Sequence, residues 1–196
     1  MKLVKHTDPW EYYTVDNFLT LDQVHTLYTL CDEGDPSRYD SYFMMNGDIQ
    51  NQASVDINMS QELSDIIKEK LQWLLTDLDL VTPNFDWGFS TNVTYPKLDV
   101  QLMPHNDDFV ELGKYGAGKI KVLVYLGKND IPYKGWGTRL YTSELVEDFA
   151  KEVEYVPGRA FIFKPVANTY HGTQFNKELE GPRYMLGAEY MEKKNG

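Results

Sequence analysis

The sequence predicts an α+β protein that is mainly β, with two helices before a strand-rich second half. Three observations support this fold class: two helical patterns before residue 80, short alternating runs from Phe85 onward, and an aromatic share of 14% that includes 14 tyrosines. Aromatic and β-branched residues favour strands, because they fit a pleated, half-buried surface. At 196 residues, with 42% hydrophobic side chains, the chain is expected to form a single domain over 1–196.

The first part of the chain, about 1–84, carries the helical patterns. Glu11–Phe18 is predicted to be a strand, and Thr20 is placed to cap a helix, with Gln23 at the capping-box position. Ser60 begins a second helix, whose apolar residues at helical spacing are Leu63, Ile66, Ile67, Leu71 and Leu74. The stretch Asp32–Asn58 is long for a connection, so it either forms a lid over a pocket or packs against the rest of the fold.

From about residue 85 to 191 the pattern changes to short alternating runs separated by turn residues. About eight strands are predicted: Trp87–Tyr95, Asp99–Met103, Lys119–Leu126, Thr138–Thr142, Glu152–Val156, Ala160–Phe163, Thr169–Gln174 and Arg183–Tyr190. This number of short strands is typical of a sandwich or jelly roll, on whose outside the two helices are expected to pack.

Net charge and cysteine content narrow the possible partners. The formal net charge of −11 argues against nucleic acid or an anionic membrane as the default partner. The one cysteine, Cys31, excludes an intramolecular disulfide and a multi-cysteine metal cage, and its helical setting favours a buried thiol over a nucleophile. Because the sequence shows neither an apolar run that spans a bilayer nor a signal-peptide pattern, a cytoplasmic location is expected.

Three residues of the β half form a candidate metal site. His105 and Asp107 are two positions apart in a strand-like run, so both side chains lie on one face. His171 supplies a third ligand from a later strand, whereas His6 and His25 are expected to be ordinary surface residues. Two imidazoles and one carboxylate on one side of an ion leave its other positions open, as a non-haem Fe(II) oxygenase requires. Zinc prefers a closed set, or three ligands plus water.

The His-x-Asp triplet is weak evidence by itself. With 30 acidic residues among 196, four histidines produce a His-x-acid triplet by chance about half the time. Arg183 strengthens the case, because it follows His171 after a turn and an antiparallel return brings its guanidinium back to the same cavity. Such a planar, permanently charged fork suits the distal carboxylate of a dicarboxylate co-substrate. The alternative is a surface arginine that pairs with one of the many acids.

Several ordered motifs resemble the Fe(II)/2-oxoglutarate-dependent dioxygenases, and in particular their prolyl-4-hydroxylase-like branch. The resemblance covers about residues 85–190, with a weaker one in Tyr12–Leu19. The core family positions fall, in order, on His105, Asp107, His171 and Arg183. The other segments that match are Tyr95-Pro96, Val124-Tyr125-Leu126-Gly127, Gly135–Tyr141, Pro157–Phe163 and Gly181–Tyr184.

The resemblance implies a double-stranded β-helix (jelly-roll) core at about 85–191, with the helical part at about 1–84 outside it. It also implies Fe(II) bound by the two histidines and the aspartate, and 2-oxoglutarate held by Arg183, Tyr95 and Tyr125. O₂ is then the oxidant, 2-oxoglutarate becomes succinate and CO₂, and ascorbate supports turnover. The chain departs from the family pattern at Met185, where many relatives have serine, at Gly127, where asparagine is usual, and in a slightly long spacing before the arginine.

The expected substrate follows from the branch resemblance: a prolyl residue in a peptide or protein, which the enzyme hydroxylates. A free amino acid or another small molecule is the alternative substrate. Two other classes stay open, namely a catalytically inactive cupin-like metal-binding module and a metal-dependent isomerase or hydrolase on a similar barrel. Neither class needs Tyr95, Tyr125 and Arg183, so these residues distinguish an oxygenase from both.

Overall fold

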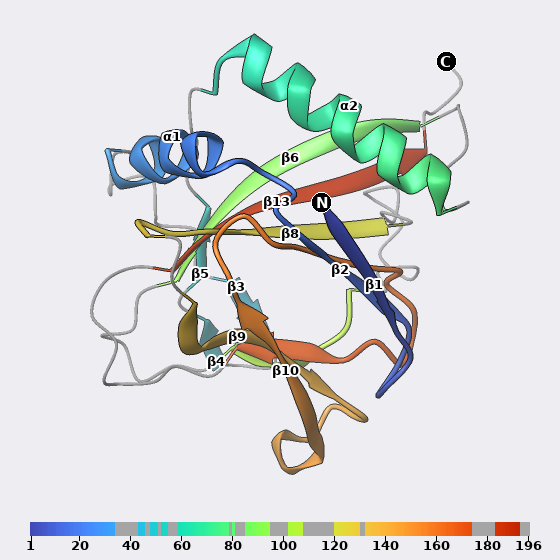
Figure 1. The fold of residues 1–196 in the computed structure, drawn as a ribbon. Coiled ribbons are helices and arrows are strands. Elements are labelled where there is room, and N and C mark those ends of the chain that lie inside the picture. Colours follow the sequence, from blue (N-terminus) through green and yellow to red (C-terminus); the bar gives the residue numbers. More distant parts are fainter. Residues whose placement is uncertain are drawn as a thin grey trace.

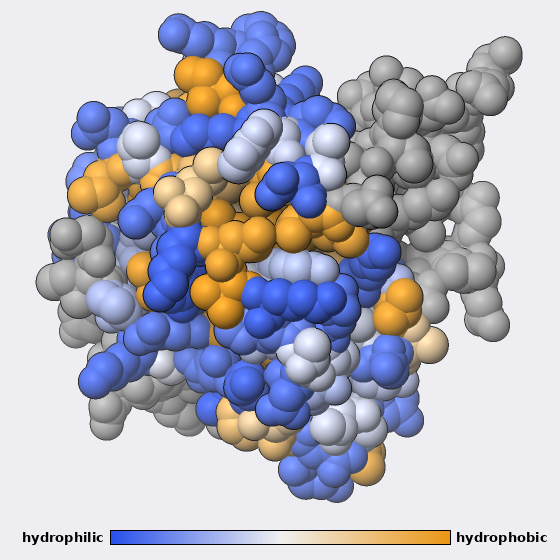
Figure 2. Space-filling model, turned by 45° about the vertical axis from the view of Figure 1, so that its right-hand side comes forward, coloured by the Kyte–Doolittle hydropathy of each residue, from blue (hydrophilic) through white to orange (hydrophobic). Residues whose placement is uncertain are grey.

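The computed structural model describes residues 1–33, 43–45, 48–50, 52–54, 59–78, 80, 85–94, 102–107, 120–129, 132–173 and 183–192. Two antiparallel sheets face each other, and both helices lie on the outer side of the larger one (Figure 1). The face seen in Figure 2 is mainly hydrophilic, with hydrophobic groups gathered near its middle. No helix in this part of the chain is long and apolar enough to span a membrane.

Among the described residues, the larger sheet has seven strands in the order β1-β2-β11-β8-β13-β6-β5. Their bounds are β1 Lys2–His6, β2 Tyr12–Asp16, β5 Gln52–Ser54, β6 Phe85–Thr94, β8 Ile120–Leu126, β11 Ala160–Phe163 and β13 Arg183–Glu192. The smaller sheet, in the order β10-β9-β12-β7, consists of β7 Leu102–His105, β9 Tyr133–Tyr141, β10 Phe149–Tyr155 and β12 His171–Thr173. A separate ribbon pairs β3 Phe43–Met45 with β4 Asp48–Gln50.

Among the described strands from β6 to β13, each strand lies in the sheet opposite to that of the strand before it, except that β10 follows β9 in the smaller sheet. All the strand pairs described are antiparallel. This alternation is the topology of a double-stranded β-helix. The predicted mainly β class and jelly-roll core are therefore confirmed.

The two helices begin where the sequence predicts. In α1 (Leu21–Asp32), the Gln23 backbone N–H donates to Thr20 Oγ1, and the Thr20 N–H donates to Gln23 Oε1, which completes the capping box. In α2 (Gln61–Asp77), Ser60 Oγ accepts from the backbone N–H of Leu63. Each cap satisfies N–H groups that have no partner inside the helix.

The helices and the larger sheet enclose one apolar cluster, which we call the outer cluster. It combines Val24 and Leu27 of α1, Ile67 and Leu71 of α2, and the outer face of β8. Cys31 is also buried there, and burial raises the pKa of its thiol to about 12. The prediction of a buried, unreactive cysteine is therefore supported.

A second cluster, the inner cluster, fills the space between the sheets and is largely aromatic. Its members are Trp10, Tyr12, Tyr125, Trp136, Leu140, Val153, Tyr155, Phe161, Phe163 and Met185. Strands β2, β8, β11 and β13 alternate residue by residue between the outer and inner clusters, because successive side chains of a strand point to opposite faces. The inner faces of these strands border the candidate site.

Some predictions need correction or stay open. All eight predicted strands of the second half are present, Ala160–Phe163 with the predicted bounds and the others with shifted ends, whereas β1, β3, β4 and β5 were not predicted. His25 is exposed as expected, whereas His6 is half-buried in β1, with Nε2 3.0 Å from Thr14 Oγ1 and its ring stacked on Tyr12. Most of Asp32–Asn58 lies outside the described residues, so its predicted role as a lid is not addressed, and β5 within it joins the larger sheet beside β6.

Candidate metal centre

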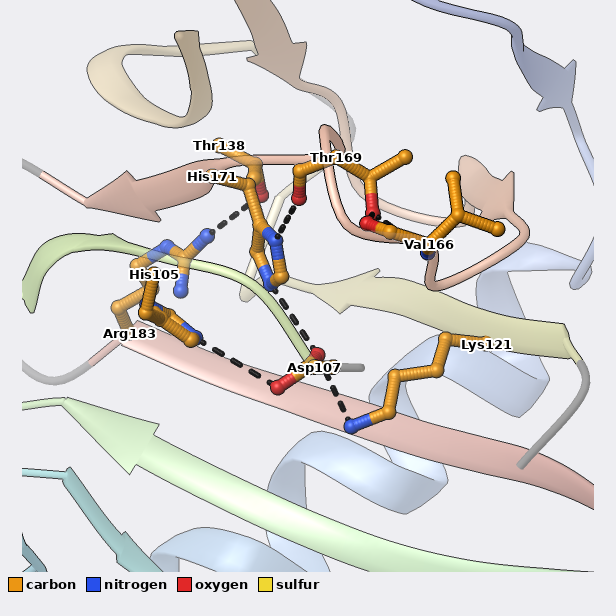
Figure 3. A network of polar contacts seen from close by, with 8 residues as sticks. All are labelled: His105, Asp107, Lys121, Thr138, Val166, Thr169, His171 and Arg183. Atoms are coloured by element: carbon orange, nitrogen blue, oxygen red, sulfur yellow. Dashed lines mark hydrogen bonds and ion pairs between the residues drawn. The ribbon is translucent and has the colours of Figure 1, made fainter. Parts of the chain in front are cut away.

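The two histidines of the predicted site face each other across a strand pair. His105 ends β7, His171 begins β12, and the two residues are direct partners in the antiparallel register. Their ring centroids are 4.4 Å apart. Asp107 follows β7 by two residues, and one ligand atom from each of the three side chains lies within 4.8 Å of the others. Among the described residues this is the one such group, and Figure 3 shows the three side chains converging.

Asp107 is the electrostatic centre of the group. Its Oδ2 lies 3.3 Å from His171 Nε2 and 2.9 Å from Lys121 Nζ, while its Oδ1 lies 3.7 Å from His105 Nε2. The side chain is 11% exposed, and this burial acts to raise the pKa of Asp107. The neighbouring His171, Lys121 and His105 outweigh burial and hold the pKa well below its usual range. The carboxyl therefore stays ionised, which is the form that binds a metal.

The ring orientation of His171 is set by its other nitrogen. Nδ1 lies 3.1 Å from the Thr169 carbonyl oxygen, and because a carbonyl only accepts, Nδ1 donates. When the ring binds a metal, its lone pair is then on Nε2, the nitrogen on the Asp107 side of the ring. Thr169 is itself tied to Val166 by its hydroxyl and by its backbone N–H. The loop between β11 and β12 thus holds His171 in a ligating orientation.

Arg183, the first residue of β13, is buried at 1% exposure on the inner side of the larger sheet. Its Nε donates to the Trp136 carbonyl oxygen at 2.6 Å, and its Nη2 donates to Thr138 Oγ1 at 3.3 Å. Among the described residues, Nη1 has no hydrogen-bond partner although it is buried. Burial also lowers the pKa of Arg183. A buried cation with an unpaired N–H is costly, so this group is well suited to an anionic acceptor.

Tyr125 and Thr138 complete the surroundings of the arginine. The Tyr125 hydroxyl donates to Thr138 Oγ1 at 2.8 Å, so Thr138 accepts from both Tyr125 and Arg183. The guanidinium carbon lies 5.7 Å from the centroid of Tyr125 and 5.3 Å from that of Tyr155. Burial raises the pKa of both tyrosines, which therefore stay protonated. Figure 3 shows the Arg183–Thr138 hydrogen bond in the same view as the three candidate ligands.

The predicted residues thus fall into three groups. The structure brings His105, Asp107 and His171 together, and it brings Tyr125 together with Arg183. Tyr95 lies just after β6, outside the described residues, so its contact with a co-substrate stays a prediction. Four neighbours were not singled out from the sequence: Lys121, Thr138, Tyr155 and Thr169. Thr138 lies within the Gly135–Tyr141 segment that matched the family, which was a usable signal, whereas the other three carried none.

Two of the three departures from the family pattern, Gly127 and Met185, are seen in the structure. A Cβ at Gly127 would lie 2.5 Å from Pro157 Cγ and 2.9 Å from Tyr133 Cε2, so there is no room for asparagine. Met185 is 4% exposed and fills the inner cluster with an apolar side chain.

Two other arginines of the strand-rich half, Arg139 and Arg159, have different surroundings. Arg159 Nε lies 2.6 Å from Asp16 Oδ1, so a carboxylate already engages it. The guanidinium of Arg139 lies 4.7 Å from the Phe149 ring centroid, and its Nε is 3.8 Å from Glu152 Oε2. Arg183 has no such acidic partner among the described residues, which favours it for binding an external carboxylate.

Comparisons with solved structures show which proteins have a similar fold. No family model and no curated protein matches the chain. A prolyl-4-hydroxylase from Pseudomonas putida matches at a TM-score of 0.60 and 17% identity, over 93% of each chain. The viral collagen prolyl hydroxylase of Paramecium bursaria Chlorella virus-1, in its 2OG complex, matches at 0.62 and 16%, over 96% of this chain and 99% of that one.

The non-haem α-ketoglutarate-dependent epimerase SnoN of nogalamycin biosynthesis matches at a TM-score of 0.63 and 14% identity, over 92% of this chain and 78% of that one. The chain has the fold that these oxygenases share. At such identities the likeness establishes the fold alone, since one fold hosts many activities.

Proposed function

We propose that this protein is an Fe(II)- and 2-oxoglutarate-dependent dioxygenase. The observation that carries the proposal is a His/Asp/His group accompanied by a buried arginine whose Nη1 has no partner among the described residues. A metal-binding module, an isomerase or a hydrolase accounts for the three ligands. None of these accounts for a desolvated guanidinium at the inner face of the same barrel.

The residues of the site fit both an Fe(II) ion and a 2-oxoglutarate molecule. Two imidazole nitrogens and one carboxylate oxygen are ligands that Fe(II) accepts while keeping positions open for a chelating co-substrate and O₂. Arg183 fits the distal carboxylate of 2-oxoglutarate through Nη1, because Trp136 and Thr138 already orient the rest of the fork. When bound, Fe(II) supplies the redox chemistry that converts 2-oxoglutarate and O₂ to succinate and CO₂ and hydroxylates the substrate.

The chain's own side chains supply orientation and shielding. Thr169 keeps the His171 lone pair toward the site, and Tyr125 and Thr138 keep Arg183 in place. The aromatic inner cluster keeps water away from the interior, which strengthens polar contacts there. A cytoplasmic location and support of turnover by ascorbate belong to the same proposal.

We propose a prolyl residue in a peptide or protein as the substrate. Support comes from the two prolyl hydroxylases above and from a third of this fold, a Trichoplax adhaerens prolyl hydroxylase in complex with a hypoxia inducible factor peptide, which matches at a TM-score of 0.60 and 15% identity. A small molecule is the second candidate, because the fold is shared with SnoN, whose complex contains nogalamycin RO.

The test is a turnover assay with labelled 2-oxoglutarate, Fe(II), O₂ and ascorbate, in which succinate release is measured with and without candidate substrates. Peptides and free amino acids are screened for a mass gain of one oxygen, and each peptide that responds is repeated with its proline replaced. His105→Ala is the inactive control. Metal binding without 2-oxoglutarate binding or succinate release contradicts the oxygenase and favours the metal-binding module.

A further inference from the structure

Lys121 makes a contact at the candidate metal centre that the family pattern does not include. Its Nζ lies 2.9 Å from Asp107 Oδ2, and the two side chains are 15% and 11% exposed. Figure 3 shows Lys121 reaching Asp107 from the side opposite to His105. A charge-assisted hydrogen bond of this length, mostly shielded from water, is among the stronger polar contacts in proteins.

The strand that carries Lys121 is held firmly. β8 pairs with β11 on one side and with β13 on the other, so it lies inside the larger sheet. Lys121 and Tyr125 are four residues apart on β8 and face the same side, about 13 Å apart at about 3.3 Å per residue. One end of this inner face contacts Asp107, and the other contacts Thr138 beside Arg183. A single strand face thus supports both ends of the candidate site.

We propose that Lys121 is a positioning residue for the metal ligand Asp107, an inference that rests on the proposed function. The ammonium engages Oδ2 and so restricts the rotation of the carboxylate relative to the two imidazoles. A carboxylate binds an ion through one oxygen or through both. Because Lys121 engages one oxygen, binding through both is disfavoured. The ion then keeps positions open for 2-oxoglutarate and O₂.

Two effects of opposite sign act on metal affinity, and this makes the proposal testable. The ammonium repels a dication, so repulsion alone predicts tighter metal binding when Lys121 is removed. Positioning predicts weaker binding, because the carboxylate then turns more freely. Side chains that hold metal ligands in place are typically worth about 10- to 100-fold in metal affinity. We expect positioning to dominate, since Lys121 contacts the ligand itself.

The experiment measures Co(II) binding to the full chain by calorimetry and by visible absorption, without turnover. Lys121→Met keeps the unbranched apolar stem of the side chain and removes the ammonium, and it should bind Co(II) about 10- to 100-fold more weakly. Its Co(II) spectrum should also change, because the ligand geometry changes. Lys121→Arg restores a cationic donor and should bind within a few-fold of the unsubstituted protein. The matched control is Lys128→Met, an exposed position just beyond β8, which should change nothing.

Equal or tighter Co(II) binding by Lys121→Met overturns the positioning role, whether or not the spectrum changes. If circular dichroism shows that Lys121→Met does not fold, the Co(II) affinities of Lys121→Arg and Lys121→Gln are compared instead to test the positioning role. The arginine variant is expected to bind more tightly than the glutamine variant, and the opposite order or equality overturns the proposal. Absence of Co(II) binding by the unsubstituted protein contradicts the proposed function itself, so the two failures are distinguishable.

Discussion

The two faces of β8 have different environments, and the difference separates stability from function. The residues that face the helices are Ile120, Val122, Val124 and Leu126, all in the outer cluster. The residues that alternate with them face the space between the sheets, where Lys121 contacts Asp107 and Tyr125 contacts Thr138. The outer face is purely aliphatic, whereas the inner face presents an ammonium and a phenol to the site. Substitutions on the two sides should therefore change different measurements.

The largest expected effect on activity comes from a substitution at the candidate metal centre, between the two sheets. His105→Ala removes one of three ligands, so metal-dependent succinate release should fall to background. Its thermal unfolding midpoint should change little, because His105 lies outside both apolar clusters. Activity is measured with labelled 2-oxoglutarate and folding by circular dichroism. Retained turnover in a folded His105→Ala protein would move the metal site elsewhere.

Substitution of Arg183 should weaken the binding of 2-oxoglutarate and leave the binding of the metal unchanged. Arg183→Ala removes the buried cation, and loss of one partner of a buried charge pair costs about 2–5 kcal/mol, or at least about 30-fold in 2-oxoglutarate affinity. The 2-oxoglutarate affinity of Arg183→Lys should lie between those of the unsubstituted protein and Arg183→Ala, because lysine keeps the charge and loses the two-pronged guanidinium. Both are measured by calorimetry with the Co(II)-loaded protein, with Co(II) affinity as the control. Unchanged 2-oxoglutarate affinity in Arg183→Ala would point to Arg139 or Arg159 instead.

A substitution in the outer cluster should lower stability and leave ligand binding unchanged. Leu71 of α2 is fully buried in the outer cluster, so Leu71→Ala should lower the free energy of unfolding by about 2–5 kcal/mol. Once the protein is folded, 2-oxoglutarate and Co(II) affinities should match those of the unsubstituted protein. Stability is measured by urea denaturation. A large loss of 2-oxoglutarate affinity in Leu71→Ala would show that the two faces are coupled.

The smallest effect is a pH dependence that arises in the outer cluster. Burial raises the pKa of Cys31 to about 12, whereas an unfolded cysteine titrates near about 8.5. Between these values the unfolded chain loses a proton that the folded chain keeps, so the free energy of unfolding falls as pH rises. The contribution is intact below about pH 8.5, and it falls by roughly 1 kcal/mol by about pH 9.5.

Urea denaturation at several pH values checks this titration, with Cys31→Ala as the comparison. The substitution shifts stability by a constant amount through lost packing and should remove the alkaline fall attributable to the thiol. An equally steep fall in both proteins would contradict the titration of Cys31.

Local features of the fold were predictable because they depend on neighbours in sequence. The caps at Thr20 and Ser60 involve residues three positions away, and the strands of the second half follow from alternation. β1 was missed because it is the edge strand of the larger sheet, and most of Lys2–His6 is exposed, so it shows no apolar alternation. His6 is not part of the candidate metal group, as expected, and its partial burial comes from stacking on Tyr12 across that strand pair.

The order of motifs along the chain, by itself, identified His105, Asp107, His171, Tyr95, Tyr125 and Arg183 as candidates. Strand periodicity indicated a sandwich or jelly roll, and the family resemblance favoured the jelly roll. Only the tertiary structure decided that Lys121 contacts Asp107, that Thr169 orients His171, and that Trp136 and Thr138 hold Arg183 with Nη1 unpaired among the described residues. The reason is physical. A hydrogen-bonded cap or an alternating strand involves residues a few positions apart, whereas these contacts join different strands and loops, and they depend on strand order and register.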